Sequence, residues 1–240
     1  MNDMYVGQSL HHYGEFSQGE VNVFDQIVQE GDVVVEAGAH MGAHSLFLAK
    51  KVGPRGLLLA FEPQRLQFQL LCANMALNSI IGAICQQAAL GAERGSLIVP
   101  VADPTRVANF GGLKIEGHES GDPVPLLQLD SFPLQRCKLL KVDVEGMEKQ
   151  VLEGAKGIIQ RHWPALYVEN DRRDKSEALI RFIDALGYDM YWHRPPLFNP
   201  ENFANNPVNI FADLVSANLL CLPKHAAQNM TGFRKVLLPA

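Results

Sequence analysis

Cysteines are few in this chain and carry no recognisable pairing pattern. Cys72, Cys85, Cys137 and Cys221 are widely scattered, and no C-x-x-C pair occurs. Such spacing is typical of small buried side chains in a reducing compartment, not of a disulfide framework or a zinc site.

Long apolar runs and blocks of basic residues are also missing. No run approaches the roughly 20 residues of a membrane-spanning helix, and the N-terminus lacks the apolar stretch of a secretory signal. The formal net charge of −5, with no cluster of lysine or arginine, argues against a general nucleic-acid binder. We therefore expect a cytoplasmic protein with no membrane span and no nucleic-acid partner, and the sequence is compatible with an oligomer.

The 240 residues, 47% of them hydrophobic, suffice for one sizeable α/β domain with a buried core. Short apolar runs alternate with segments of helical periodicity, which predicts a mostly parallel, doubly wound sheet with an antiparallel last strand. The predicted strands are 33–36, 57–61, 84–89, 139–142, 165–168, 188–192 and 214–222, and the predicted helices 43–52, 64–77, 149–160 and 176–186.

Composition shifts divide the chain further. Residues 1–30 read as an N-terminal arm and helix packing on the core, and residues 31–223 as the main domain. Within it, residues 91–123 are rich in turn residues and short β-like pieces, which predicts a β-rich insertion. Residues 194–210 are rich in proline and asparagine and predict an irregular pocket segment. Residues 224–240 are expected to form a C-terminal tail.

The first motif is a glycine-rich turn behind the first strand. The run Val33-Val34-Val35 ends at Glu36, and Gly38-Ala39-His40-Met41-Gly42 leads into the next helix. Glycine lets a backbone approach a ligand closely. The dinucleotide pattern G-x-G-x-x-G is absent because Glu36 fills its first glycine position. An acid there suits a cofactor with a cationic amine, such as S-adenosylmethionine (SAM). A simple strand–helix turn is the alternative.

A second acid, Glu62, follows the second strand about twenty residues after the glycine turn. An acid at that place can accept hydrogen bonds from both ribose hydroxyls. The alternative is a cap for the helix that Pro63 introduces. Gln87 and Ala88 end the third predicted strand and could border the adenine ring.

Further acidic residues follow the later predicted strands. Asp143, Glu145 and Glu148 follow strand 139–142, and Glu169 and Asn170 end the next one. Carboxyl ends of parallel strands meet at one edge of a sheet, so Asp143, Glu169 and Asn170 offer oxygen ligands for Mg²⁺ or another divalent ion. Helix-capping or hydrogen-bonding acids are the competing interpretation.

Transfer of a methyl group to a hydroxyl needs alignment and removal of a proton. Asp143, Glu145 and His193 are the candidates for that role, and His193 adjoins the irregular segment. Aromatic residues of several segments are expected to form the wall for a sugar-like acceptor. A role in the core is the alternative for them. They are Tyr13, Trp192, His193, Phe198 and Phe203.

Together these segments resemble the FkbM family of SAM-dependent methyltransferases. The resemblance covers roughly residues 31–169, and its most specific element is Asp143-Val144-Glu145-Gly146-Met147-Glu148 followed by Leu152-Glu153-Gly154-Ala155. It implies a Rossmann-like class I methyltransferase fold and methylation of a hydroxyl on a sugar or secondary metabolite. By position, Glu36, Gly38 and Gly42 would frame the methionine part of SAM and Glu62 its ribose. Asp143 and Glu145 would face the methyl group. The commonest form of the first motif has Asp at position 36 and Asn at 40, where this chain has Glu36 and His40.

The sequence thus predicts SAM binding by Glu36, Gly38, Ala39, His40, Gly42, Glu62, Pro63, Gln87, Ala88 and Asp143. The predicted function is methylation of a small-molecule or glycan acceptor. A non-catalytic SAM-binding protein and a dinucleotide-dependent oxidoreductase are the alternatives.

Overall fold

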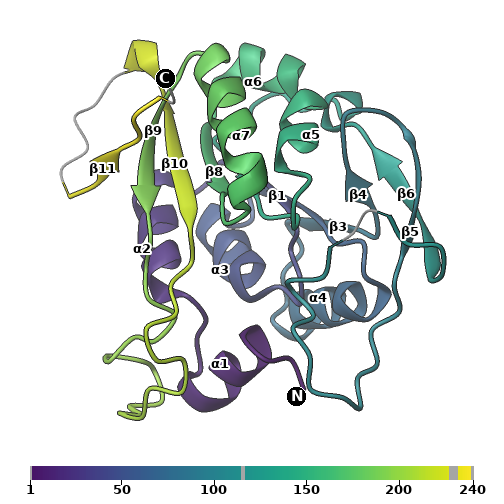
Figure 1. Ribbon diagram of the computed structural model, residues 1–240, viewed down its shortest axis with the longest axis vertical. Helices are drawn as coiled ribbons and strands as arrows, with labels where there is room; N and C mark the ends of the chain where they lie inside the picture. The colour runs from purple at the N-terminus through teal and green to yellow at the C-terminus, as the bar shows by residue number, and fades with distance from the viewer. Residues whose placement is uncertain (1, 115–116, 227–231, 239–240) are drawn as a thin grey trace.

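The computed structural model describes residues 2–114, 117–226 and 232–238, so parts of the predicted insertion and tail lie outside the described residues. An eight-stranded sheet forms the centre, in the order β11-β9-β10-β8-β7-β1-β2-β3 (Figure 1). Its strands are β1 (Val33–Ala37), β2 (Leu57–Phe61), β3 (Ala83–Gln86), β7 (Leu139–Val142), β8 (Ala165–Glu169), β9 (Tyr188–His193), β10 (Asn218–Pro223) and β11 (Arg234–Lys235).

The middle of the sheet is parallel, as its apolar strands predict. β1 pairs in parallel with both β2 and β7, and β7 pairs in parallel with β8. β10 runs antiparallel to β8 and β9, which confirms the antiparallel last strand of the main domain. Strands buried on both faces read as continuous apolar runs, and all five residues of β1 are buried.

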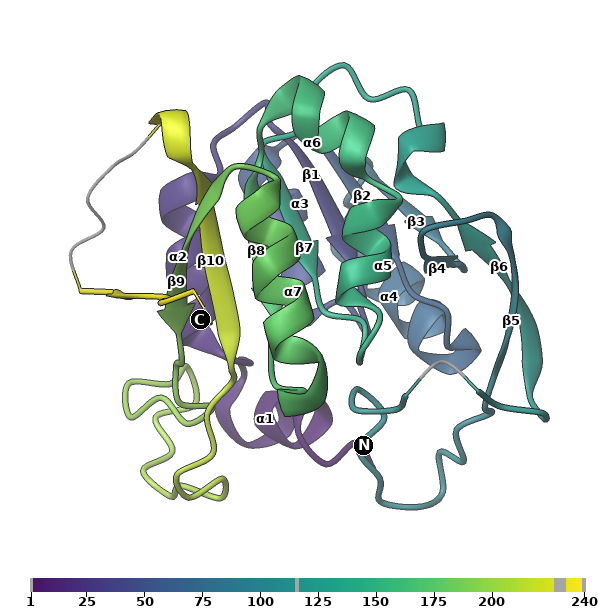
Figure 2. The ribbon, with the colours of Figure 1, turned by 45° about the horizontal axis from the view of Figure 1, so that its top comes forward.

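Helices cover both faces (Figure 2). Alternate side chains point to opposite faces, so Val35 packs with the helices after β7, whereas Val34 packs with those nearer the N-terminus. The first set is α5 (Glu148–Glu153), α6 (Lys156–His162) and α7 (Arg173–Ala185). The second is α2 (Gln18–Ile27), α3 (Ala43–Val52) and α4 (Arg65–Leu77).

Several predicted elements are wrong in extent. The predicted strand 214–222 begins only at Asn218. The predicted helix 149–160 is interrupted between α5 and α6 because Gly154 packs against the backbone of Gly91, whose carbonyl oxygen lies 2.0 Å from a Cβ placed at Gly154. The predicted strand 84–89 is also divided, because the chain leaves the main sheet after Gln86.

The departing chain joins a small second sheet. β4 (Ala89–Leu90), β5 (Gly95–Val99) and β6 (Asp122–Leu127) form it in the order β4-β6-β5. The 3₁₀ turn η1 (Leu129–Ser131) follows β6. A β-rich segment therefore occupies this region, with bounds wider than the predicted ones.

The ends of the chain pack on the domain. The N-terminal arm contains a helix, α1 (Val6–Tyr13), that lies beside the irregular segment after β9 (Figure 1). The Tyr13 hydroxyl donates to the carbonyl oxygen of Val208 at 2.8 Å. After β10 come the 3₁₀ turn η2 (Lys224–Ala226) and β11, which pairs with β9, so part of the predicted tail extends the sheet. Among the described residues, no helix is both long and apolar enough to cross a bilayer.

Candidate functional site

A cavity of about 460 Å³ opens above the carboxyl ends of the central strands. Its lining comes from the ends of β1, β2, β7 and β8, from α1 and α2, and from the segment before β10. This is where parallel α/β sheets bind their ligands. The cavity therefore coincides with the edge at which the sequence analysis placed its candidate residues.

Gly38 brings two strand ends into contact. Its φ is +82°, and a Cβ there would stand 1.7 Å from the carbonyl oxygen of Asp143. The Asp143 amide also donates to the Ala37 carbonyl at 3.0 Å. Gly38 was expected to let a cofactor approach the backbone. It also allows the turn after β1 to pack closely against the end of β7.

Glu62 ties the glycine turn to the next helix. Its carboxylate accepts the backbone N–H of His40 and that of Gln64, each at 2.8 Å. His40 has a left-handed φ of +50°, a conformation uncommon for a residue with a side chain. Burial raises the pKa of Glu62 to about 7 although these two hydrogen bonds oppose the shift. Glu62 thus fixes the turn, and each of its oxygens retains a lone pair for a ligand.

A buried lysine stands between two acids of the cavity. Lys141 is 2% exposed, and its Nζ lies 3.1 Å from Asp143 Oδ2 and 3.5 Å from Glu36 Oε1. Ser45 donates its hydroxyl to the other oxygen of Glu36 at 2.5 Å. Burial alone would lower the pKa of Lys141, but the charges of Asp143, Glu36 and Glu20 outweigh burial and raise it. The neighbouring acids therefore favour the charged ammonium form of Lys141.

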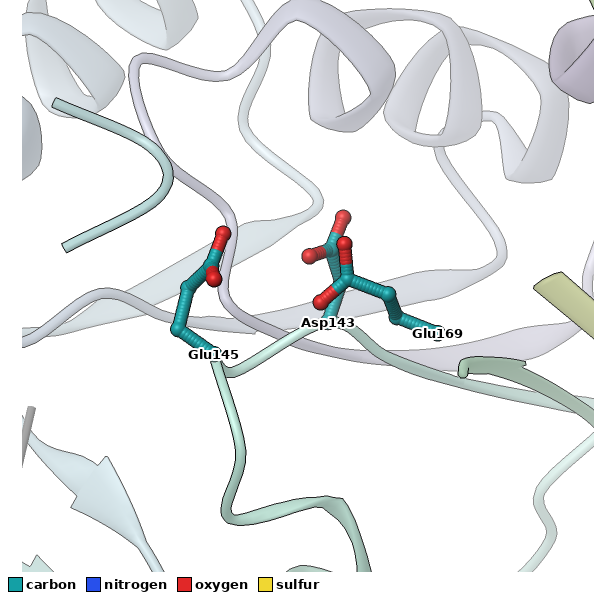
Figure 3. A group of neighbouring side chains, drawn as sticks. All are labelled: Asp143, Glu145 and Glu169. Carbon is teal, nitrogen blue, oxygen red and sulfur yellow. The ribbon is translucent and has the colours of Figure 1, made fainter. Parts of the chain in front are cut away.

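Three acids gather at the ends of β7 and β8. One carboxylate oxygen from each of Asp143, Glu145 and Glu169 lies within 4.8 Å of the other two, and the side chains point into the same space (Figure 3). Arg172 pairs with Glu145. Glu145 has a left-handed φ of +56°, so the turn after β7 adopts a costly conformation to present this side chain.

Crowding and burial shift the pKa values of this acid cluster. Burial, followed by the charge of Asp143, raises the pKa of Glu145 to about 7 against the opposing effect of Arg172. Burial and the neighbouring acids raise the pKa of Glu169 well above its ordinary value. Glu169 Oε2 is buried without a hydrogen-bond partner. Such a cluster favours protons or a bound cation.

Most predicted site residues line the cavity. They are Glu36, Gly38, Ala39, His40, Glu62, Pro63, Ala88, Asp143, Glu145 and Glu169. Gly42, Gln87, Asn170 and His193 are not among the described residues that line it. Gly42 instead caps α3 with φ +89°, and His193 Nδ1 shares a hydrogen bond of 2.7 Å with the Tyr167 hydroxyl.

The aromatic residues expected at the acceptor wall are placed elsewhere. Tyr13 and Phe198 belong to a small apolar cluster under α1, and Phe203 is 72% exposed. Trp192 packs against the main core and carries the guanidinium of Arg194 over its ring. The aromatic residues that line the cavity are Tyr5, Phe16 and Phe61.

Several lining residues escaped the sequence analysis, and only some had a visible signal. Lys141 interrupts a strand that is otherwise apolar, which marks a buried charge with a partner. Glu20 in α2 and Asn218 in β10 carry no such mark, because only the tertiary fold brings them to the cavity. Glu20 is 4% exposed and accepts hydrogen bonds from Ser17 and Asn218 at 2.9 and 3.3 Å.

Comparisons with known proteins agree on the family. The family model "Methyltransferase FkbM domain" matches residues 36–190, more than half of the chain. Methyltransferase sdnD of Sordaria araneosa is 31% identical over 163 residues, 54% of this chain and 61% of that protein. Methyltransferase 1 of Beauveria bassiana is 28% identical over 152 residues, 54% of this chain and 59% of that protein. The aligned part thus spans less than two thirds of either relative.

Solved structures of low sequence identity share the fold. An FkbM methyltransferase from Methylobacillus flagellatus matches with a TM-score of 0.54 at 14% identity, over 83% of this chain and 50% of that one. A Streptococcus mutans protein in complex with S-adenosylhomocysteine (SAH) matches with a TM-score of 0.52 at 10% identity, over 85% of this chain and 96% of that one. The fold is the Rossmann-like class I methyltransferase fold, as predicted. The chain belongs to the methyltransferase FkbM domain family.

Proposed function

We propose that this chain binds SAM in the cavity and transfers its methyl group to a hydroxyl of a sugar, glycan or secondary metabolite. The observation that carries the proposal is the position of the cavity, above the carboxyl ends of β1, β2 and β7 and between Glu36, Glu62 and Asp143. Family membership supports the same activity.

The polar lining fits such a cofactor. His44 Nε2, Gln64 Oε1 and Glu169 Oε2 are buried atoms without hydrogen-bond partners, and all three residues line the cavity. Buried polar atoms are nearly always satisfied, so their presence favours a polar ligand. The free lone pairs of Glu62 suit ribose hydroxyls, and the acids suit the cationic amine of a methionine moiety. Gly38, Ala39, His40, Pro63 and Ala88 supply the rest of the proposed cofactor surface.

SAM supplies an electrophilic methyl group whose sulfur leaves as a neutral thioether. The chain must therefore align a nucleophile and remove its proton. We propose that Glu145 is the general base that removes this proton, because its raised pKa of about 7 suits that role near neutral pH. Asp143 is the alternative base. His193 is less well supported, because it is outside the described lining of the cavity.

We also propose that the acid cluster of Asp143, Glu145 and Glu169 can hold a divalent cation. Three carboxylates within 4.8 Å offer the hard oxygen ligands that Mg²⁺ and Mn²⁺ prefer. Glu145 takes here the place predicted for Asn170. With an ion bound, Glu145 would be a ligand and not the general base, so these two roles of Glu145 are alternatives. Such an ion would lower the pKa of an acceptor hydroxyl.

The acid-rich lining supports an uncharged small-molecule or glycan acceptor and argues against nucleic acid, whose phosphates it would repel. A cytoplasmic location is also part of the proposal and is supported by four free cysteines.

The experiment is a screen of nucleotide sugars, free glycans and small phenols with SAM, read by mass spectrometry, with Asp143→Asn as the comparison. We expect one class to gain a methyl group with the wild type only. SAM affinity without turnover across the panel would favour the non-catalytic alternative. A preference for protein or nucleic acid would contradict the proposed acceptor.

A further inference from the structure

One buried lysine joins the acid of the cofactor turn to the acid cluster. The register of β1 and β7 sets Lys141 directly beside Glu36, and Asp143 follows two residues later on the same face. The Lys141 ammonium lies within 3.5 Å of a carboxylate oxygen of each acid. It lines the cavity, so its charge acts on whatever binds there.

A third acid reaches the same group of side chains from the N-terminal part of the chain. Glu20 of α2 lines the cavity, is 4% exposed, and is influenced by the charge of Lys141. Both Glu20 and its hydrogen-bond donor Asn218 lie outside residues 36–190, which the family model matches. Lys141 thus pairs with Glu36 of β1 and with Asp143 after β7, and its charge also acts on Glu20 of α2.

Removal of this ammonium would take the counter-charge from the buried carboxylates of Glu20 and Glu36 and from the partly exposed Asp143. A buried charge that loses its partner is costly. We propose that Lys141 is a positioning residue that holds the Glu36 and Asp143 carboxylates in the cavity. We further propose that its charge sets how strongly the cavity prefers SAM over SAH. The inference rests on the proposed binding of SAM in this cavity.

SAM and SAH differ by one methyl group and one positive charge on sulfur. A change that merely loosens the fold weakens both ligands alike. A change of charge beside the cavity alters mainly the affinity for the charged sulfur. The ratio of the SAH Kd to the SAM Kd therefore separates an electrostatic role of Lys141 from a purely structural one.

The experiment is calorimetry with SAM and with SAH on the wild type, Lys141→Met and Lys141→Arg. Loss of the positive charge should raise the ratio in Lys141→Met by about fivefold, the order expected for one charge near the cavity. Lys141→Arg, which keeps the charge, should return the ratio to within about twofold of the wild type. Lys138→Met is the matched control, because Lys138 is exposed and lies just before β7. It should leave the ratio unchanged.

Glu20→Gln keeps the test decisive if Lys141→Met does not fold. Removal of that negative charge should lower the ratio. An unchanged ratio in Glu20→Gln, an equal loss of SAM and SAH affinity in Lys141→Met, or a failure of arginine to restore the ratio would each overturn the inference. A wild type that binds neither ligand would instead refute the proposed function.

Discussion

The main-chain carbonyl oxygen of Asp143 occupies the space in which a side chain at Gly38 would begin. A Cβ at Gly38 would lie only 1.7 Å from that oxygen, and Gly38 also has a left-handed φ of +82°. This contact sets the strand-end acid Asp143 beside the turn that follows β1. The site is therefore assembled by a backbone packing requirement and not only by its polar side chains.

Substitution of Gly38 by alanine should severely destabilise the protein. The left-handed conformation alone costs about 1–2 kcal/mol for a residue with a Cβ, and here the Cβ would also displace the end of β7. Gly31→Ala is the matched control, since Gly31 has φ +88° and a Cβ added there would meet nothing within 4 Å. Chemical denaturation should show a much larger loss for Gly38→Ala. Equal losses would mean that β7 moves away without cost.

Substitution of Glu62 by alanine should weaken SAM binding by about 2–3 kcal/mol, the cost of losing charge-assisted hydrogen bonds to buried hydroxyls. The same change removes the acceptor of two backbone N–H groups, that of His40 in the glycine turn and that of Gln64 at the start of α4. Calorimetry should therefore be paired with thermal unfolding. SAM affinity that stays at the wild-type level in the folded variant would exclude the ribose role.

Glu169→Gln should stabilise the cofactor-free protein at alkaline pH. The folded-state pKa of Glu169 is raised well above 4.5, mainly by burial. A raised carboxyl pKa contributes stability that is fully present below the unfolded value of about 4.5 and is lost as the pH rises through the folded value. Glutamine is not subject to this loss. In chelator, the free energy of unfolding at pH 8 should be larger for the variant than for the wild type, and the difference should vanish near pH 4. A difference in the free energy of unfolding between variant and wild type that did not depend on pH would contradict the raised pKa of Glu169.

Removal of a divalent ion should abolish turnover and leave SAM affinity nearly unchanged, because the ion would act on the acceptor oxygen. Direct titration of the chelated protein with Mn²⁺, followed by magnetic resonance, should detect a site that Asp143→Asn and Glu169→Gln both lose. Asp171→Asn is the control, since Asp171 lines the cavity but does not belong to the cluster of three acids. Full activity in excess chelator would exclude the ion.

The sheet was largely predictable from the sequence because its signal is local. Apolar runs with no polar alternation identify buried parallel strands, and β2 and β7 begin and end where the sequence analysis placed them. Breaks caused by distant contacts were not predictable. Gly154 interrupts the predicted helix 149–160 because of Gly91, more than sixty residues away along the chain.

The candidate site was likewise predictable only where its signal is local. Glu36 lies next to the last residue of β1, and Glu62 and Asp143 directly follow β2 and β7. The rule for parallel sheets therefore places all three at one edge, where they line the same cavity. Lys141 interrupts an apolar strand, so the sequence marks it as a buried charge. Its partner Glu36 was not predictable from that signal, because it belongs to β1, far away along the chain. His193 also ends a strand, but β9 lies beyond β10 in the sheet, away from β7 and β1. Sequence order alone does not reveal that distance.

The most direct test of SAM binding is calorimetry of the wild-type chain with SAM, SAH and NADH under identical conditions. We expect saturable binding of SAM and of SAH at one site per chain and no binding of NADH. Binding of NADH, with no response to SAM or SAH, would contradict the proposed cofactor.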